Sequence, residues 1–187
     1  GASIRSLLFT PGNHPDKVTK VFISGADVAI LDLEDAVAIS QKVATRSPIV
    51  EALKMSRKCL GYVRINSADT EFYEGDLTAV IGPWLDGVIL PKVETVDQLL
   101  AADVTMQELE IAYGLKPGRI DLIPIIETAK GLSAVSDISR CGSRIRRISF
   151  GAVDFAKDLG MKLSLDEWEL TPARSDIVLA SRIAGLE

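Results

Sequence analysis

Two apolar stretches in the second half of the chain decide the fold. They are Ile120-Asp121-Leu122-Ile123-Pro124-Ile125-Ile126-Glu127-Thr128 and Arg147-Ile148-Ser149-Phe150-Gly151-Ala152-Val153-Asp154-Phe155. Continuous runs of Ile, Leu and Val are typical of strands that are buried on both faces of a parallel sheet. The segment between them, 128–140, has apolar residues at helical spacing and is predicted as a helix. The order strand, helix, strand predicts that Glu127 and Asp154 lie at the same ends of neighbouring strands.

This pair of carboxylates is a candidate metal site, because parallel α/β proteins build their sites at the carboxyl ends of strands. Two carboxylates repel each other unless a cation or a proton lies between them. Hard divalent ions such as Mg²⁺ are commonly held by one or two carboxylates together with water and substrate oxygens. The alternative is that Glu127 caps the following helix and Asp154 is a turn residue. Spacing alone leaves both interpretations open.

Composition predicts one folded, soluble domain that spans residues 1–187. The chain is 47% hydrophobic and 25% charged, and its net charge of −5 argues against nucleic acid or an anionic membrane as a partner. It contains no apolar run long enough to span a bilayer and no signal-peptide pattern at its start. The two cysteines, Cys59 and Cys141, are isolated, which suits a reducing compartment. We therefore expect a cytoplasmic protein.

The chain has a single histidine, His14, which restricts the chemistry available to it. A multi-histidine zinc site is excluded within one chain. A Ser-His-Asp triad would have to use His14, and the sequence has no GxSxG motif to accompany it. Catalysis would have to rest mainly on carboxylates, arginine and lysine.

Strands and helices alternate along the whole sequence. Predicted strands cover 4–10, 28–33, 61–65, 87–90, 120–128 and 147–155, and predicted helices cover 15–24, 36–57 with an interruption at Pro48, 72–81, 95–102, 107–113, 128–140 and 172–183. This alternation predicts a parallel α/β fold. A (β/α)8 TIM barrel takes about 250 residues, so about six βα units in 187 residues indicate an incomplete barrel. The rival, an open doubly wound sheet, predicts a glycine-rich loop after the first strand, and Thr10-Pro11-Gly12-Asn13 is not GxGxxG.

Two further groups of charged residues follow predicted strands. Asp32, Glu34 and Asp35 form the densest acidic cluster, and strand alternation places Asp32 and Glu34 on one face. Buried acids are costly unless they are hydrogen-bonded or lie near a cation, which favours a site role for at least one of them. The alternative is an acid-rich helix start, which would account for Asp35. Arg64 ends the third strand, where it could hold a carboxylate bidentately or form a surface ion pair.

Six motifs lie at predicted strand ends. They are Arg5-Ser6-Leu7-Leu8-Phe9-Thr10-Pro11-Gly12, Leu31-Asp32-Leu33-Glu34-Asp35-Ala36-Val37, Val63-Arg64-Ile65-Asn66, Leu90-Pro91-Lys92-Val93-Glu94, Pro124-Ile125-Ile126-Glu127-Thr128 and Phe150-Gly151-Ala152-Val153-Asp154-Phe155. Together they resemble the citrate lyase β-subunit-like (CitE-like) branch of the HpcH/HpaI aldolase family, which also contains malyl-CoA and citramalyl-CoA lyases. The resemblance covers essentially the whole chain.

The resemblance implies a Mg²⁺-dependent carbon–carbon lyase on a TIM barrel. Glu127 and Asp154 match the family's metal carboxylates, and Arg64, with Glu127, matches its substrate-binding residues. The acidic cluster would orient metal-bound waters, and its members are candidates for the base, namely Asp32, Glu34 and Asp35. The implied reaction splits a 3-hydroxyacyl thioester of CoA or of an acyl-carrier protein, such as citryl-CoA, into an acetyl thioester and a keto acid.

Alternative activities remain within and outside this branch. They are a malyl- or citramalyl-CoA lyase, an aldolase acting on free 2-keto acids, and a non-catalytic subunit of a multi-enzyme complex. The aldolase branch uses a histidine base near the second strand, where this sequence has none. The resemblance also implies a barrel with two more strands than the six predicted here. The resemblance further implies a homo-oligomer, a trimer or hexamer, and citrate lyase α and γ subunits as partners.

Overall fold

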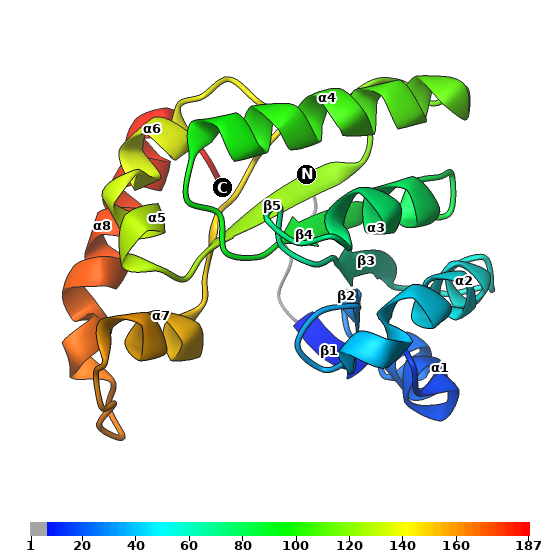
Figure 1. Cartoon of the computed structure of the whole chain (residues 1–187), viewed down its shortest axis with the longest axis horizontal. Coiled ribbons are helices and arrows are strands. Elements are labelled where there is room, and N and C mark those ends of the chain that lie inside the picture. Colours follow the sequence, from blue (N-terminus) through cyan, green and yellow to red (C-terminus); the bar gives the residue numbers. More distant parts are fainter. Residues whose placement is uncertain (1–6) are drawn as a thin grey trace.

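The computed structural model describes residues 7–187 of the chain. Six parallel strands form one sheet in the order of the sequence, from β1 to β6. They are β1 (Leu7–Pro11), β2 (Val28–Asp32), β3 (Leu60–Arg64), β4 (Gly87–Leu90), β5 (Asp121–Ile126) and β6 (Ser149–Phe150). Of the predicted first strand, residues 4–6 lie outside the described part. The sheet curls into part of a barrel, which confirms the incomplete TIM-barrel-like fold (Figure 1).

Helices connect the strands and surround the outside of the curved sheet (Figure 1). They are α1 (Pro15–Ile23), α2 (Lys42–Leu53), α3 (Tyr73–Val80), α4 (Val96–Ala112), α5 (Ala129–Ser133), α6 (Val135–Ser139), α7 (Ala152–Leu159) and α8 (Thr171–Ala184), with two 3-10 turns, η1 (Ile39–Gln41) and η2 (Trp168–Leu170). Among the described residues, no helix is both long and apolar enough to cross a membrane.

The central strands β2, β4 and β5 are buried on both faces, as continuous apolar runs predict, whereas Leu8 and Phe9 of β1 are exposed. On β2, Ala29 and Leu31 belong to the large core between the sheet and the helices, whereas Val28 and Ile30 belong to the inner face. The inner cluster consists of Val28, Ile30, Tyr62, Ile89, Ile123 and Ile125. It lines a cavity of about 390 Å³ on the concave side of the sheet.

Three predicted helix boundaries are wrong. The predicted helix 36–57 is a turn followed by η1 and α2, and Pro48 lies inside α2 without ending it. Pro48 and Ala44 are both exposed, so the carbonyl that loses its helical partner can bind water. The predicted pieces 95–102 and 107–113 are one helix, α4, whose buried stripe continues through Met106. The predicted helix 128–140 is split into α5 and α6.

The largest difference concerns the predicted strand 147–155. Only Ser149–Phe150 is a strand, and the chain turns at Gly151 into α7, which begins at Ala152. Phe155 and Ala156 form the buried side of this helix, and the Phe155 ring packs edge-on against Phe150 at a centroid distance of 5.2 Å. The apolar residues after Gly151 therefore follow helical spacing, and the prediction of a long strand is wrong.

Candidate active site

Asp32 and Arg64 face each other at the carboxyl ends of β2 and β3, where they are register partners. The guanidinium is bidentate: Nε donates to Oδ1 of Asp32 at 2.8 Å and Nη2 donates to Oδ2 at 2.7 Å. The backbone amides of Glu34 and Ala36 donate to the same two oxygens, each at 2.9 Å. Burial raises the pKa of Asp32, but the Arg64 guanidinium and these amides outweigh it and hold the pKa below its usual value.

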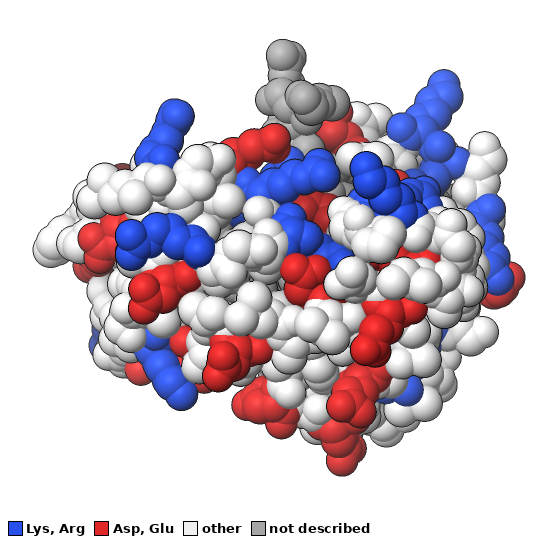
Figure 2. Space-filling view, turned by 90° about the horizontal axis from the view of Figure 1, so that it is seen from above, with Lys and Arg blue, Asp and Glu red and all other residues white. Residues whose placement is uncertain are grey.

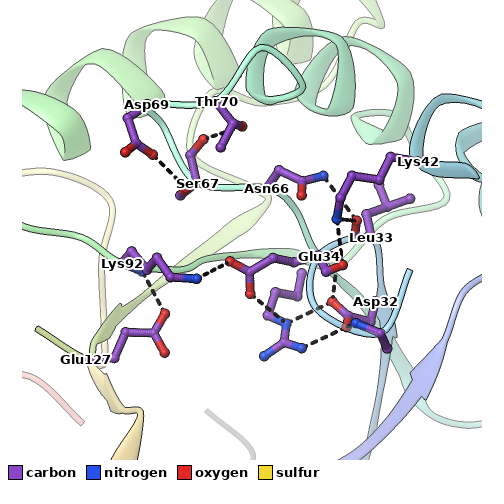
Figure 3. Close-up of polar contacts among 12 residues, drawn as sticks. Asp32, Leu33, Glu34, Lys42, Asn66, Ser67, Asp69, Thr70, Lys92 and Glu127 are labelled. Atoms are coloured by element: carbon purple, nitrogen blue, oxygen red, sulfur yellow. Dashed lines mark hydrogen bonds and ion pairs between the residues drawn. The ribbon is translucent and has the colours of Figure 1, made fainter. Parts of the chain in front are cut away.

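Glu34 follows the end of β2 and is also buried. Its Oε2 accepts a hydrogen bond from Nζ of Lys92 at 3.0 Å, and its Oε1 lies 3.6 Å from Nε of Arg64. Oε1 has no hydrogen-bond partner among the described residues. Burial raises the pKa of Glu34 in spite of the ammonium of Lys92. Figure 3 shows Glu34 lying between Asp32 and Lys92.

Asp35 lies apart from these buried acids. It is exposed in the turn after Glu34, and α2 begins only at Lys42, so the interpretation of Asp35 as a helix-start residue is wrong. Its charge still acts on the site, because it contributes to raising the pKa of Arg64 and the pKa of Lys92. The structure therefore brings Asp32 and Glu34 into contact with Arg64 and leaves Asp35 at the rim.

Glu127 follows the last residue of β5 and is 3% exposed. Its Oε1 accepts a hydrogen bond from the backbone amide of Lys92 at 2.9 Å. Its other side faces Gly151, where an added Cβ would lie 2.5 Å from Oε2, so the close approach of the two segments requires glycine. Burial and a hydrogen bond with the Asp154 side chain raise the pKa of Glu127 to about 7.

Asp154 reaches Glu127 from a different element than predicted. It lies in the first turn of α7. The short pairing of β6 with β5 continues as a bond from the Gly151 amide to the Ile126 carbonyl at 3.0 Å, which brings the start of α7 beside Glu127. The interpretation of Asp154 as a strand-end turn residue is therefore wrong, although the two carboxylates do meet.

This pair suits a divalent cation, since two adjoining carboxylates repel each other unless a cation or a proton lies between them. Within residues 7–187, no group of three or more His, Cys, Asp or Glu side chains is arranged to hold a metal ion. A Mg²⁺ ion at Glu127 and Asp154 would therefore need water or substrate oxygens for its other ligands, as Mg²⁺ sites commonly do.

Lys92 is a site residue for which the sequence analysis assigned no role. It contacts Glu34 through its ammonium and Glu127 through its backbone amide. Burial alone would lower the pKa of Lys92, but the hydrogen bond and the charge of Glu34 raise it. Its position directly after β4, in the segment Pro91-Lys92-Val93, could have marked it as a site residue.

A second missed group supports the turn that follows β2. Nζ of Lys42 donates to the carbonyls of Leu33 and Glu34 at 3.0 and 2.6 Å. The side-chain Nδ2 of Asn66 donates to the same Leu33 carbonyl at 3.1 Å and to the fully buried carboxylate of Asp76. Figure 3 shows the contacts of Lys42 and Asn66 with the turn after β2. They join residues 8 to 33 positions apart in the sequence, so no local pattern predicts them.

The arginine cluster before β6 has structural partners. Arg144 donates to Asp103 at 2.6 Å and lies 2.7 Å from the buried Glu110, which ties this segment to α4. Arg147 pairs with Glu187 at 2.6 Å. The side chain of Arg144 is 5% exposed, so it holds this loop against α4 and does not extend into solvent.

Comparison with known proteins shows to which family the chain belongs. Residues 5–187 match the model of the HpcH/HpaI aldolase/citrate lyase family. The chain belongs to this family. It is 35% identical over 185 residues to the citrate lyase subunit beta of Escherichia coli (strain K12), which covers 98% of this chain and 61% of that protein. It is 39% identical over 165 residues to the L-malyl-CoA/beta-methylmalyl-CoA lyase of Cereibacter sphaeroides (strain ATCC 17029), which covers 84% of this chain and 51% of that protein.

A solved structure gives the same result. Protein CitE from Mycobacterium tuberculosis, in complex with magnesium, acetoacetate and coenzyme A, superposes with a TM-score of 0.76 at 30% identity. The match covers 96% of this chain and 62% of that one. The chain thus spans about three fifths of the length of the citrate lyase subunit that it matches.

Proposed function

We propose that this family member takes part in the Mg²⁺-dependent cleavage of a carbon–carbon bond in a 3-hydroxyacyl thioester. The substrate is a thioester such as citryl-CoA or its acyl-carrier form, and the products are an acetyl thioester and a keto acid. The observation that carries the proposal is the meeting of the buried Glu127 with the half-buried Asp154, at the same end of the sheet as the Asp32–Arg64 pair. A related protein has been crystallised with magnesium, acetoacetate and coenzyme A.

Cleavage begins with loss of the proton from the 3-hydroxyl group. The C–C bond then breaks, the hydroxyl carbon becomes the keto carbon, and the electron pair moves to the thioester enolate, which takes up a proton. Mg²⁺ held by Glu127 and Asp154 would supply a positive charge for the hydroxyl and carboxylate oxygens of the keto-acid half. The protein's own residues have to position these groups and balance the charge that develops.

Arg64 is suited to bind the negative charge of the substrate. Asp32 occupies Nε and Nη2 and fixes the plane of the guanidinium, while Nη1 makes no hydrogen bond within the described chain. A guanidinium fixed in this way can donate to a substrate carboxylate or to the enolate oxygen without further reorganisation.

The acids of the β2 turn differ in what they can offer. Both oxygens of Asp32 are occupied by Arg64 and by backbone amides, so Asp32 is best suited to orienting Arg64. Glu34 has a buried oxygen, Oε1, without a hydrogen bond, and this oxygen can accept one from a substrate hydroxyl or a water. Asp35, exposed at the rim, is suited to orienting water. We therefore place Glu34 ahead of Asp32 as the acceptor of the proton.

The second candidate function is cleavage of malyl-CoA or a methylated homologue. It is favoured by the 39% identity to the malyl-CoA/methylmalyl-CoA lyase. The aldolase on free 2-keto acids has less support, because the sole histidine, His14, is exposed in the turn before α1. A non-catalytic subunit remains the alternative outside enzyme chemistry.

Partners follow from the same proposal. The substrate arrives as a CoA or acyl-carrier-protein thioester, and the protein works as a homo-oligomer, a trimer or hexamer, or with citrate lyase α and γ subunits. Acidic and basic side chains are interspersed on the face shown in Figure 2, and the net charge is −5, so we expect neither nucleic acid nor an anionic membrane as a partner.

A substrate screen tests the proposal directly. Citryl-, malyl- and citramalyl-CoA are each incubated with the protein and Mg²⁺, and the release of acetyl-CoA and the keto acid is measured. We expect one of them to be cleaved, and chelation of Mg²⁺ to stop the reaction. Copurification with an acyl-carrier protein and a CoA-transferase subunit would favour the multi-subunit role, whereas a protein inactive on all three thioesters, alone and with such partners, would contradict the proposal.

A further inference from the structure

Lys92 has a backbone conformation that residues with a side chain seldom adopt. Its φ is 52°, and among residues 7–187 the only other non-glycine residue with a positive φ is Glu167. The left-handed conformation costs free energy when a Cβ is present, and it persists where the surrounding contacts fix it.

The backbone contacts of Lys92 show what this conformation achieves. The next residue, Val93, donates its amide to the Ile125 carbonyl at 3.1 Å, which continues the pairing of β4 with β5 beyond the end of β4. The Lys92 amide instead donates to Oε1 of Glu127 at 2.9 Å. The turn thus aims a backbone donor at the carboxylate proposed to hold the metal.

The side chain of Lys92 extends toward the other half of the site. Its Nζ lies 3.0 Å from Oε2 of Glu34, whose side chain is 7% exposed. Figure 3 shows Lys92 between Glu34 and Glu127, linked to each by a dashed contact. Lys92 therefore joins the acidic turn after β2 to the carboxylate pair at β5.

The charges at the site indicate what the contact between Lys92 and Glu34 does. Two cations, Arg64 and Lys92, contact the carboxylates of this site, whereas Lys42 donates to the backbone carbonyls of Leu33 and Glu34. The carboxylates are five, those of Asp32, Glu34, Asp35, Glu127 and Asp154. Oε1 of Glu34 is already 3.6 Å from Nε of Arg64. Without the Lys92 ammonium, the Glu34 carboxylate would have Arg64 as its remaining ion-pair partner and would compete with an anionic substrate for the guanidinium.

We propose that Lys92 is a positioning residue, which limits the contact of Glu34 with Arg64 through its ammonium and aligns Glu127 through its backbone amide. The proposal rests on the proposed lyase function. It adds a role for the β4 turn in keeping the Arg64 guanidinium available to the carboxylate of the substrate.

The first test separates the side chain from the backbone. Lys92→Met removes the ammonium and keeps the Cβ, whereas Lys92→Gly also relieves the left-handed strain and retains the amide that donates to Glu127. We expect both variants to lose about tenfold in kcat/KM, mainly through a higher KM. We expect Lys92→Gly to unfold at a temperature no lower than Lys92→Met. Lys116→Met, at an exposed lysine in the loop before β5, is the matched control and should behave as wild type.

The second test asks whether Lys92 acts through Glu34. In wild type, Glu34→Gln should reduce kcat/KM, but in the Lys92→Met background it should reduce kcat/KM by a smaller factor and lower the raised KM, because it removes the competitor for Arg64. Wild type, the two single variants and the double variant are also compared by urea unfolding without metal. The effects of the two substitutions on the free energy of unfolding should again be non-additive. Equal effects of Glu34→Gln in both backgrounds, or recovery of wild-type kinetics in Lys92→Gly, would overturn the proposal.

The failure of the proposed function would look different. It would show as inactivity of the wild-type protein on every thioester, while the unfolding cycle still reports whether Lys92 and Glu34 are coupled. Additive unfolding free energies in that cycle would overturn the Lys92 proposal independently of activity.

Discussion

At the scale of single residues, the site depends on a guanidinium held in one plane by a buried carboxylate. Asp32 binds two nitrogens of Arg64 and also accepts two backbone amides, so neither side chain is free to rotate. Removing one partner of a buried pair leaves an uncompensated charge, which is costly. The geometry of Arg64 therefore depends on its planar fork and on the ionised state of Asp32.

Arg64→Lys tests the fork. Lysine keeps the positive charge but presents a point charge on a flexible stem, so it cannot bind Asp32 bidentately and present a fixed donor to the substrate. We expect kcat/KM to fall at least about tenfold, or roughly 1.4 kcal/mol of transition-state stabilisation. Steady-state kinetics on the thioester identified by the screen measure this loss. Wild-type kinetics in Arg64→Lys would contradict the role of Arg64 in substrate binding and would leave it only its ion pair with Asp32.

Asp32→Asn tests the ionised state through the pH dependence of stability. The pKa of Asp32 is lower in the folded protein than its usual value of 3.8, so its contribution to the free energy of unfolding is present above about pH 4 and is lost as the pH falls. We expect Asp32→Asn to be less stable at pH 7 by about 3 kcal/mol, and to lose less stability than wild type between pH 5 and pH 2. Urea unfolding across this range measures both effects. Parallel stability curves for the two proteins would contradict this explanation.

At the scale of elements, the turns after β2, β4 and β5 carry the site, and the helices that follow them fix these turns. The clearest example is α4, which begins with a capping box: Thr95 accepts from the Gln98 amide at 3.2 Å, and the Gln98 side chain accepts from the Thr95 amide at 3.3 Å. Gln98 also accepts from the Glu94 amide at 2.8 Å. The β4 turn that contains Lys92 is thereby tied to the start of α4.

Thr95→Ala removes the side chain that caps α4. We expect the free energy of unfolding to fall by about 1 kcal/mol, which corresponds to a melting temperature about 2–4 °C lower for a chain of this size. Calorimetry measures this change, and Thr78→Ala at an exposed site within α3 serves as the control. A melting temperature in Thr95→Ala that matches wild type would show that the cap contributes nothing to stability.

The elements also show where reasoning from the sequence succeeds. Apolar runs such as 120–126 identify buried strands, and their ends locate Asp32, Arg64 and Glu127, because the carboxyl ends of parallel strands are local features of the chain. The same reasoning extended the last strand through Asp154, because the apolar residues of α7 cannot be told from a buried strand over so short a run. The position of Lys92 after β4 is a local feature, but its contacts with Glu127 and Glu34 were not predicted. These contacts are with residues 35 and 58 positions away, and they depend on a left-handed turn that the sequence does not indicate.

At the scale of the whole molecule, the sheet has two edges and an open inner face. In the described part of the chain, β1 and β6 each pair on one side only. Leu8 and Phe9 on β1 are 42% and 51% exposed, and the inner apolar cluster borders the cavity of about 390 Å³. Exposed apolar edges of this kind pair readily with other chains unless something covers them.

The 187 residues on their own are therefore expected to self-associate. Light scattering over a range of concentrations should give a mass above 20.2 kDa, and Leu8→Lys, which places a charge on the edge strand, should reduce the association. Exposed Ile111 on α4, changed to Lys, is the matched control on a helix. A stable monomer of the wild-type sequence at all concentrations would mean that the edges and inner face do not drive association.

The central claim is that Glu127 and Asp154 together hold the Mg²⁺ on which the reaction depends. Calorimetric titration of Mg²⁺ into wild type, into Glu127→Gln with Asp154→Asn, and into the exposed control Glu108→Gln tests this claim most directly. We expect wild type and the control to bind Mg²⁺ with the same affinity, and the double variant to show neither binding nor Mg²⁺-dependent cleavage. A double variant that binds Mg²⁺ and cleaves the thioester as wild type does would contradict the assignment of the site.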